Sequence, residues 1–327
     1  MSPLALAVSH FLIHCALQLH NESYHIIRIQ KLRSFAILVL YFKRRNVAIQ
    51  FFNGEFLPQE AIKFSINDVG ILRGYGLFDF FRVIEQVPVF LEDHLDRFEN
   101  TSKIMGMEVP YTREKLASVI QELATINGFE LGYIKMVMTG GDTPDGFSPG
   151  KPNLAILNNP LASPPESKFT DGISLMTYDY TRDFPQAKST HYAMAVRLQK
   201  YWGPAGHMDV LYHAAGQVSE VSRSNVFFFK DNKLVTNENG ILLGITRKQI
   251  LQLAREKYEV EVRDFTLDEL LSADEMFITG TNKQVMPVVM LDNQPIAEGK
   301  VGSNCKALLA DFRQYVSEYV TARKVKT

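Results

Sequence analysis

The chain has very little cysteine. Only Cys15 and Cys305 occur among its 327 residues, and they lie far apart in the sequence. Two such distant residues form neither a disulfide framework nor the paired spacing of a zinc site. We therefore expect a protein of a reducing compartment, the cytoplasm, that has no metal site. Cys305 is expected to be a buried thiol and not a nucleophile, because no Cys/His motif surrounds it.

Excess charge is also missing. The 35 basic and 36 acidic residues leave a net charge of −1, and 46% of the residues are hydrophobic. This balance gives no electrostatic reason to expect nucleic acid or an anionic membrane as a partner. No internal repeat is present. The length and composition indicate a soluble globular chain with enough core for two modest domains.

Acidic residues are nearly absent from the first 46 residues, where Glu22 is the only one. The two apolar runs of this segment, "LALAVSHFLIHCAL" and "FAILVLYF", are shorter than the ~20 residues that span a bilayer. Their order relative to the basic residues does not fit a secretory signal. We expect residues 1–46 to be a peripheral extension or an over-long start, with an organelle transit peptide as the alternative.

Regular patterns of a small N-terminal α+β domain fill residues 47–157. The stretch "VAIQFFNGEFLP" contains two strand-like runs joined by Asn53-Gly54, a pair typical of a tight hairpin turn. Amphipathic helices are expected over 93–106 and 113–128, because each has an apolar face and ends at a glycine. A strand is expected over 133–139.

A proline-rich stretch then divides the chain. Residues 158–167, "NNPLASPPES", contain three prolines without apolar periodicity, which predicts an extended interdomain linker. Residues 168–327 form the expected larger C-terminal domain. Its strands are expected at 172–180, 208–222, 224–237, 260–265 and 274–281, and its helices at 247–258 and 303–322. Many strands broken by tight turns predict an α+β fold, with a partly closed barrel as one arrangement, and not a doubly wound parallel sheet.

Three weak signals in this second half concern chemistry. The stretch "FPQAKSTHYAMAVRLQKYWG" predicts a helix over 184–203 with Lys188 at its head, where a lysine is ordinarily a solvated charge. Ile245 and Thr246 open a helix, and the free amides there could hold a phosphate, although a threonine at this place is more often a cap. Glu220 lies within an apolar strand. A buried carboxylate requires a partner, whereas an outward-facing one does not.

Taken together, these segments resemble the class IV (fold type IV) pyridoxal-phosphate aminotransferases. That family includes branched-chain aminotransferases, D-amino acid aminotransferases and aminodeoxychorismate lyase. The likeness spans about Ile49 to Tyr319 and rests on five segments in the family's order: "FLEDHLDRF", "AKSTHY", "SEVSRSNVF", "LLGITR" and "ADEMFITGT". It implies a two-domain α+β enzyme of mostly antiparallel sheets with flanking helices, pyridoxal 5′-phosphate as cofactor, and a homodimer.

The resemblance also implies roles for single residues. Lys188 resembles the lysine that forms the Schiff base with the cofactor aldehyde, a reaction that needs a neutral amine. Glu220 resembles the carboxylate that faces the pyridine nitrogen, and Arg97 resembles the arginine that binds the phosphate. Ile245, Thr246 and Thr281 are expected beside the phosphate. Ser222 and Asn225 are expected to shape the cofactor pocket.

Residues around the substrate are implied with more alternatives. Phe78 stands where an aromatic lines the family's pocket, while Tyr133 and Lys135 occupy a strand that carries Tyr-x-Arg in the branched-chain enzymes. Amides of Gly280 and Asn282 could face a substrate carboxylate. Phe80 and Phe81 could extend an apolar pocket, although aromatic residues in a strand are more often core. Tyr192 could reach the cofactor or simply pack.

The expected function is therefore a transaminase that moves an amino group from a branched-chain or other apolar L-amino acid to 2-oxoglutarate. The alternatives are a D-amino acid aminotransferase or 4-amino-4-deoxychorismate lyase acting at the same site. A further alternative is an inactive scaffold or binding protein that retains the fold. Two departures from the family pattern, His191 and Arg223, could be neutral or could change the pocket.

Overall fold

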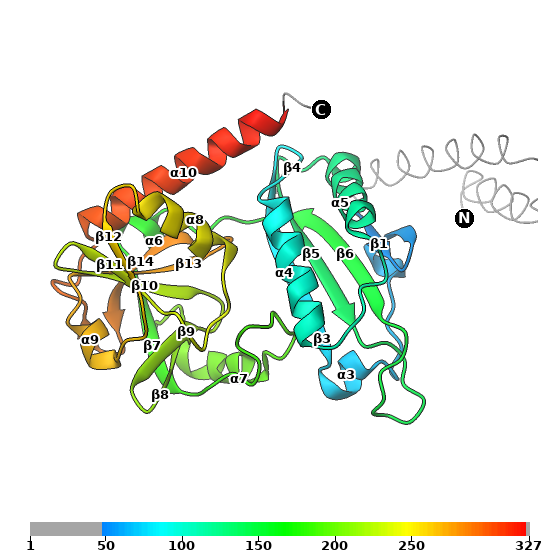
Figure 1. Cartoon of the computed structure of the whole chain (residues 1–327), viewed down its shortest axis with the longest axis horizontal. Coiled ribbons are helices and arrows are strands. Elements are labelled where there is room, and N and C mark those ends of the chain that lie inside the picture. Colours follow the sequence, from blue (N-terminus) through cyan, green and yellow to red (C-terminus); the bar gives the residue numbers. More distant parts are fainter. Residues whose placement is uncertain (1–47, 325–327) are drawn as a thin grey trace, which may run out of the picture. The chain divides into compact units, whose positions relative to one another are not determined.

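The structure, a computed structural model, describes residues 48–324. The expected extension over residues 1–46 lies outside this described range. Everything below concerns the compact unit that begins at Ile49. Its strands fall into two sheets, of six and nine strands, shown in Figure 1.

The first sheet is antiparallel throughout, in the strand order β2-β1-β6-β5-β3-β4. Its strands are β1 (Ile49–Phe52), β2 (Glu55–Pro58), β3 (Gly76–Ile84), β4 (Val87–Pro88), β5 (Leu131–Thr139) and β6 (Asn153–Pro160). The helical segments among them are η1 (Gln59–Ala61), α3 (Val69–Arg73), α4 (Leu91–Ile104) and α5 (Arg113–Asn127). Helices α4 and α5 pack on this sheet. The Asn53-Gly54 hairpin and both amphipathic helices lie where the sequence predicts them, and Gly128 ends α5 in the left-handed region at φ 62°.

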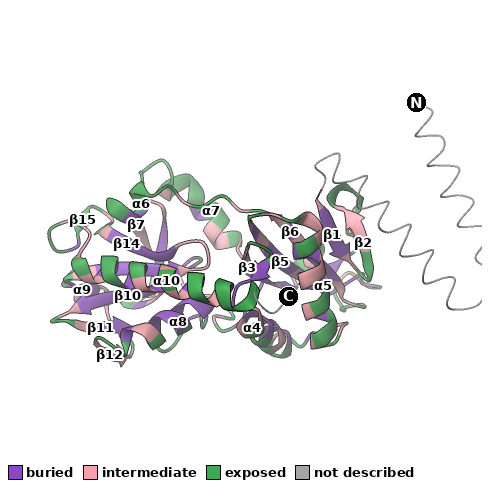
Figure 2. Ribbon diagram, turned by 90° about the horizontal axis from the view of Figure 1, so that it is seen from above, coloured by how far each residue is buried: buried purple, intermediate pink, exposed green. Residues whose placement is uncertain are grey.

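The second sheet has the order β12-β11-β10-β13-β14-β7-β8-β9, with β15 paired to β14. Its strands are β7 (Ile173–Asp179), β8 (Asp209–Ala214), β9 (Gln217–Val221), β10 (Asn225–Lys230), β11 (Lys233–Thr236), β12 (Glu259–Val262), β13 (Glu275–Gly280), β14 (Gln284–Leu291) and β15 (Gln294–Pro295). Its helices are α6 (Ser167–Thr170), α7 (Ala193–Trp202), α8 (Ile245–Ala254), α9 (Leu267–Leu271) and α10 (Ser303–Lys324). Figure 2 shows buried strands under partly exposed helices. Cys305 of α10 is 1% exposed, and burial raises the pKa of its thiol, as expected of a structural cysteine.

The second sheet is more mixed than the sequence predicts. The pairs β7–β8, β7–β14 and β11–β12 are parallel, and the others are antiparallel. Its two ends approach each other, because Val218 donates its amide to the Phe265 carbonyl at 3.0 Å and Gln217 bridges to Thr266. The sheet is therefore curled, and the whole is an α+β fold.

The predicted helix over 184–203 is wrong in its first half. Helix α7 begins only at Ala193, and Lys188 lies before it in extended chain. The residues preceding the helix are hydrogen-bonded to β3, so a tertiary contact overrides the local helical pattern. Pro185 is no obstacle in this turn, since it has no amide to satisfy.

The predicted linker is shorter than 158–167. Strand β6 continues to Pro160, and α6 begins at Ser167. The sequence pattern does not predict the end of β6 because a polar residue, Asn158, is buried in it. The Asn158 side chain accepts a hydrogen bond from Asn127 at 3.0 Å and donates one to the Tyr133 carbonyl at 3.1 Å. The division into two domains at this linker stays a prediction.

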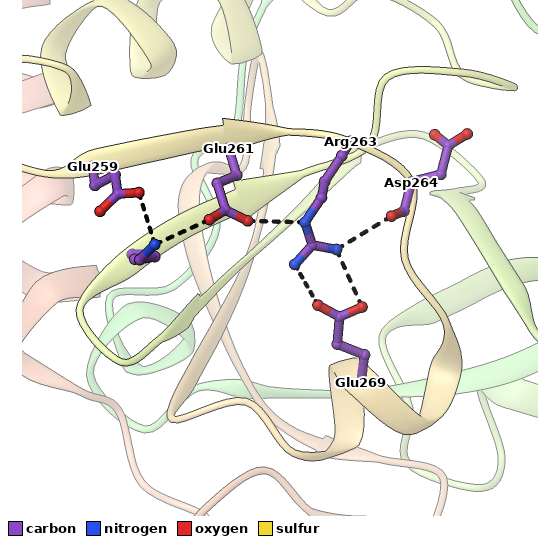
Figure 3. Close-up of polar contacts among 6 residues, drawn as sticks. Glu259, Glu261, Arg263, Asp264 and Glu269 are labelled. Atoms are coloured by element: carbon purple, nitrogen blue, oxygen red, sulfur yellow. Dashed lines mark hydrogen bonds and ion pairs between the residues drawn. The ribbon is translucent and has the colours of Figure 1, made fainter.

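Charged side chains cluster on the outside of the second sheet, around β12 and α9. Arg263 donates to Glu261 and to Glu269, as Figure 3 shows. Lys233 Nζ lies 2.7 Å from Glu259. Such exposed pairs contribute about 0–1 kcal/mol each. None of these residues lines the cavity described below. In the described part of the chain, no helix combines the length and the apolar character of a membrane span.

Candidate active site

A cavity of about 760 Å³ is lined by residues of both sheets. With the exception of Phe81, the residues that the sequence singled out for cofactor or substrate lie in its wall. The residues expected to bind the cofactor or the substrate that line this cavity are Phe78, Arg97, Tyr133, Lys135, Lys188, Glu220, Ser222, Asn225, Ile245, Thr246, Gly280, Thr281 and Asn282. The structure thus brings together residues from distant parts of the sequence, while their individual roles stay predictions.

Lys188 is held through its backbone by the first sheet. Its carbonyl accepts the Phe78 amide at 2.9 Å, and two residues later Thr190 donates its amide to the Gly76 carbonyl at 2.9 Å. The Lys188 amide donates to the Thr101 hydroxyl of α4 at 3.3 Å. The segment therefore extends the edge of β3 and directs the lysine into the cavity wall.

Burial changes the chemistry of the Lys188 amine. Burial and the nearby Arg97 lower its pKa to about 7, against the opposing pull of Asp79 and Glu220. Its Nζ lies 4.6 Å from the centre of the Phe78 ring. An amine with this pKa is substantially neutral near pH 7, which is the form that attacks a carbonyl group.

Glu220 has a partner that the sequence analysis missed. Arg182 lies 2.5 Å from its Oε1, and the Leu242 amide donates to its Oε2 at 3.0 Å. Arg182 also donates to the carbonyls of Pro185 and Ala187, at 3.3 and 2.9 Å. A partner was expected for Glu220 if its carboxylate is buried, and the family resemblance named only the cofactor as that partner. Burial still raises the pKa of Glu220 above its ordinary value, despite Arg182.

Arg97 is oriented by a buried carboxylate, Asp79 of β3. Its Nε and Nη2 donate to the two Asp79 oxygens, each at 2.8 Å. His94, one turn earlier on α4, places Nδ1 2.7 Å from Asp79 Oδ1. Burial by itself would raise the pKa of Asp79, but the charges of Arg97 and His94 outweigh it and hold that pKa well below its ordinary value. Asp79 was not singled out, because nothing in its local sequence separates it from other strand residues.

The start of α8 offers unpartnered amides to the cavity. Gly244 is its N-cap, and no side chain of residues 48–324 caps the helix. A Cβ on Gly244 would lie 2.2 Å from the Asn225 Oδ1, so the close approach requires glycine here. Asn225 also donates to the Leu242 carbonyl at 2.7 Å. Thus Asn225 braces the turn that presents Ile245 and Thr246, and the first amides of such a helix suit an anion.

The first-sheet wall of the cavity is aromatic. Phe80 packs against Tyr133 with ring centres 5.0 Å apart, and Phe78 packs against Tyr192 at 5.7 Å. Lys135 lies over Phe78, with Nζ 5.5 Å from the ring centre. Phe81 does not line the cavity. It is fully buried in the core on the other face of β3, because successive strand residues point to opposite faces.

The wall around the end of β9 is polar. Ser222 donates to buried Asp209 at 2.5 Å, and Asp209 also binds Lys283 and Arg223. Thus one of the two family departures, Arg223, lies in the cavity wall. The other, His191, does not line the cavity and lies 3.2 Å from Asp183.

These residues fit pyridoxal phosphate. The Arg97 N–H groups that Asp79 leaves open, the α8 amides and the Thr246 hydroxyl could hold a dianionic phosphate, and Glu220 could face a ring nitrogen. The Thr279 hydroxyl, also in the cavity wall, is buried without a hydrogen-bond partner among residues 48–324 and can serve a bound group. The Lys188 amine is the nucleophile that an aldehyde requires.

Known proteins resemble this chain along most of its length. The profile of the amino-transferase class IV family matches residues 76–291. A Methanocaldococcus jannaschii protein, provisionally named a branched-chain-amino-acid aminotransferase, is 32% identical over 275 residues, 80% of this chain and 94% of that protein. A D-alanine aminotransferase of Staphylococcus haemolyticus is 29% identical over 273 residues, 81% of this chain and 97% of that enzyme.

Solved structures give the same result. The branched-chain amino acid aminotransferase of the organism abbreviated T.th., with pyridoxamine 5′-phosphate, superposes with a TM-score of 0.78 at 28% identity, covering 83% of this chain and 94% of that one. The complex of that enzyme with N-(5′-phosphopyridoxyl)-L-glutamate also gives 0.78, at 29% identity, covering 83% and 95%. With Lys188, Arg97 and Glu220 around one cavity, the chain is a pyridoxal-phosphate-dependent enzyme that belongs to the class IV aminotransferases.

Proposed function

We propose that this aminotransferase moves the amino group of an apolar L-amino acid, such as a branched-chain one, to 2-oxoglutarate. The observation that carries the proposal is the buried Lys188 amine, with its pKa near 7, in a cavity whose first-sheet wall is aromatic. A neutral amine can accept a proton from a substrate carbon and return it elsewhere, which is the task of the base in amino transfer.

When bound, pyridoxal phosphate supplies an aldehyde and an electron-accepting ring. The chain supplies the rest. Arg97, fixed by Asp79, binds and orients the phosphate together with the first amides of α8. Glu220, fixed by Arg182, keeps a proton on the ring nitrogen. Lys188 moves the proton at the substrate carbon.

Support for an apolar substrate comes from the wall that Phe78, Phe80 and Tyr133 form. Aromatic side chains contribute a large apolar surface, and burial of a substrate methylene stabilises binding by about 0.8 kcal/mol. The M. jannaschii relative and the T.th. structures point to the same substrate class by their names. The 2-oxoglutarate acceptor stays a prediction from the sequence, as do the homodimer and the cytoplasmic location.

A D-amino acid aminotransferase is the second candidate. It is favoured by the several staphylococcal D-alanine aminotransferases that are 28–29% identical to this chain. Against it, the segment after β5, "GGDTPDGF", contains neither arginine nor histidine, whereas the family resemblance implies one of each just after this strand in the D-amino acid enzymes. The lyase alternative has no structural observation in its favour.

A panel of L- and D-amino acids, each with 2-oxoglutarate or pyruvate, tests the proposal. We expect L-leucine, L-isoleucine and L-valine with 2-oxoglutarate to give the highest kcat/KM, measured by formation of glutamate. The Lys188→Ala variant should lose about 10²-fold to 10⁴-fold or more in rate, because it removes both nucleophile and base. Its circular dichroism should be unchanged.

Two results would reject the proposal. Preference for D-alanine with pyruvate would favour the second candidate, and release of pyruvate from aminodeoxychorismate without an acceptor would favour the lyase. As a matched control, Lys200→Ala removes an exposed lysine from the same polypeptide segment that carries Lys188, and it should keep full activity.

A further inference from the structure

The proposed function leaves one cluster of charges in the cavity wall unexplained. Asp209, at the start of β8, is 1% exposed and lies against two cations. Its Oδ2 is 2.7 Å from Lys283 Nζ and 3.2 Å from Arg223 Nη2. Both cations line the cavity.

This cluster carries an excess positive charge. One carboxylate faces two cations, and its Oδ1 already accepts the Ser222 hydroxyl at 2.5 Å and the Val210 amide at 2.9 Å. Lys283 is the better satisfied cation, since it also donates to the Ser224 hydroxyl at 2.9 Å. Asp209 and Lys283 therefore form a neutral, buried pair, and the charge of Arg223 is left over.

Arg223 is free to bind something else. Its guanidinium carries five N–H donors, and among residues 48–324 only the contact to Asp209 uses one of them. Its side chain is 55% exposed, yet the residue lines the cavity. Asp209 thus holds one terminal nitrogen of the arginine, while Nε and Nη1 have no hydrogen-bond partner among residues 48–324 and can bind a group in the cavity.

The position of Arg223 also relates it to the reaction centre. Burial raises the pKa of the Tyr192 phenol, and the positive charges of Arg182, Arg97 and Arg223 oppose that shift. Arg223 is therefore near enough to act on a group in the cavity, but is itself at the rim, whereas the Lys188 amine lies deep inside. A substrate that presents its reacting carbon to Lys188 would direct its far end towards the rim.

The other cations of the cavity are already engaged or lie elsewhere. Arg97 donates to both oxygens of Asp79, and Arg182 donates to Glu220 and two carbonyls. Lys135 belongs to the aromatic wall and offers a single point charge, whereas a guanidinium can bind both oxygens of a carboxylate.

We propose that Arg223, anchored by Asp209, binds the second carboxylate of a dicarboxylic substrate, the glutamate or 2-oxoglutarate class, at the rim of the cavity. A transaminase must accept two substrates in turn in one cavity. An apolar side chain can lie on the aromatic wall and leave Arg223 in solvent, while a dicarboxylate reaches the arginine. This inference rests on the proposed function and specifies where its acceptor binds.

Two unreactive ligands of the holoenzyme test the assignment: glutarate, with two carboxylates, and 4-methylvalerate, with one. Their Kd values are measured from changes in the visible absorbance of the bound cofactor, so no turnover is needed. In Arg223→Gln we expect the Kd for glutarate to rise about 10-fold to 100-fold, the effect of one charge-assisted hydrogen-bonded pair. The Kd for 4-methylvalerate should change less than about twofold.

Controls separate this role from a structural one. Arg255→Gln removes an exposed arginine that does not line the cavity and should change neither Kd. Arg223→Lys keeps the charge without the fork and should recover only part of the glutarate affinity. Melting temperatures of all variants should match the wild type, because Asp209 keeps Lys283.

Two outcomes would overturn the inference. An equal loss of affinity for both ligands would assign Arg223 to the carboxylate that all substrates share, and unchanged affinities would leave it no binding role. Failure of the proposed function would give a different result. The wild-type enzyme would not transfer the amino group of any apolar L-amino acid, regardless of its Kd for glutarate.

Discussion

Two buried carboxylates act on the cavity in different ways: Glu220 of β9 lines it directly, whereas Asp79 of β3 lies behind its wall and holds Arg97. Asp79 is 0% exposed and Glu220 is 4% exposed. Asp79 receives a fork from Arg97, a contact from His94 and the Phe80 amide at 2.7 Å. Glu220 receives one arginine and one amide.

Their pKa values move in opposite directions. Burial raises both, but in Asp79 the charges of Arg97 and His94 prevail, whereas in Glu220 burial prevails over Arg182. The two carboxylates are both buried and differ in the number of donors that they accept, and Asp79, which accepts more, is the one whose pKa is lowered. Asp79 is saturated and can only position Arg97, while Glu220 retains acceptor capacity for a proton-bearing group of the cofactor.

The largest effect that would sharpen this comparison is expected for Glu220→Gln. The amide keeps the shape but removes the negative charge that stabilises a protonated ring. We expect kcat to fall about 10²-fold to 10³-fold, as when one preorganised electrostatic interaction at a reacting centre is lost. Single-turnover amino transfer, followed by the cofactor absorbance, measures the effect.

Glu220→Asp is the matched control, since it keeps the charge with a shorter reach and should retain more activity than Glu220→Gln. Cofactor affinity should change much less than kcat in both variants. A Glu220→Gln enzyme with wild-type kcat would remove the distinction between the two carboxylates.

A smaller effect on the site, accompanied by a loss of stability, is expected for Asp79→Asn. Removing one partner of a buried pair typically destabilises a protein by about 3–5 kcal/mol, which urea unfolding would measure. Because Arg97 loses its orientation, we also expect the Kd for pyridoxamine phosphate to rise about tenfold, a change of about 1.4 kcal/mol.

The surface offers a control for this variant. Glu269→Gln breaks an exposed pair with Arg263, seen in Figure 3, and should cost no more than about 1 kcal/mol and leave cofactor binding unchanged. If Asp79→Asn stabilised the protein, or bound the cofactor as tightly as the wild type, its proposed positioning role would be wrong.

The last prediction concerns the dependence of cofactor attachment on pH. The pKa of the Lys188 amine is influenced by both carboxylates. Its folded-state pKa is about 7, lowered from 10.5, so the reactive neutral form increases as pH rises through 7. The rate at which the cofactor-free protein acquires visible absorbance with pyridoxal phosphate should rise about tenfold from pH 6 to pH 8.

Loss of either carboxylate should move this profile to lower pH, since each anion favours the protonated lysine. Pyridoxamine phosphate, which has no aldehyde, serves as the control and should bind without the same dependence. A profile still rising above pH 9 would show that the Lys188 pKa is not lowered.

Sequence patterns predicted the parts of the fold that are set locally. The Asn53-Gly54 hairpin, the glycine that ends α5 and the helix that begins at Ile245 all follow from short-range rules. The extended conformation around Lys188 could not be predicted in this way, because it depends on hydrogen bonds to β3, more than a hundred residues earlier.

The same limit applies to the site. Residues within family-like segments, such as Lys188 and Glu220, were found, whereas the groups that hold them were missed. Asp79 and Arg182 carry no local signal, and only the fold shows that they reach Arg97 and Glu220. Arg223 was noticed as a departure, but its relation to Asp209 requires the pairing of β8 with β9.

The attachment of Lys188 to β3 restricts how this enzyme can move. The lysine belongs by sequence to the second half of the chain, but its main chain is bonded to the first sheet, while the charges of Glu220 and Arg182 act on it from the second. Any hinge rotation of one sheet against the other would change the separation of amine and carboxylate. We therefore expect substrate exchange to involve segments at the cavity mouth and to leave the two sheets in place, which keeps the amine and the carboxylate at a constant separation.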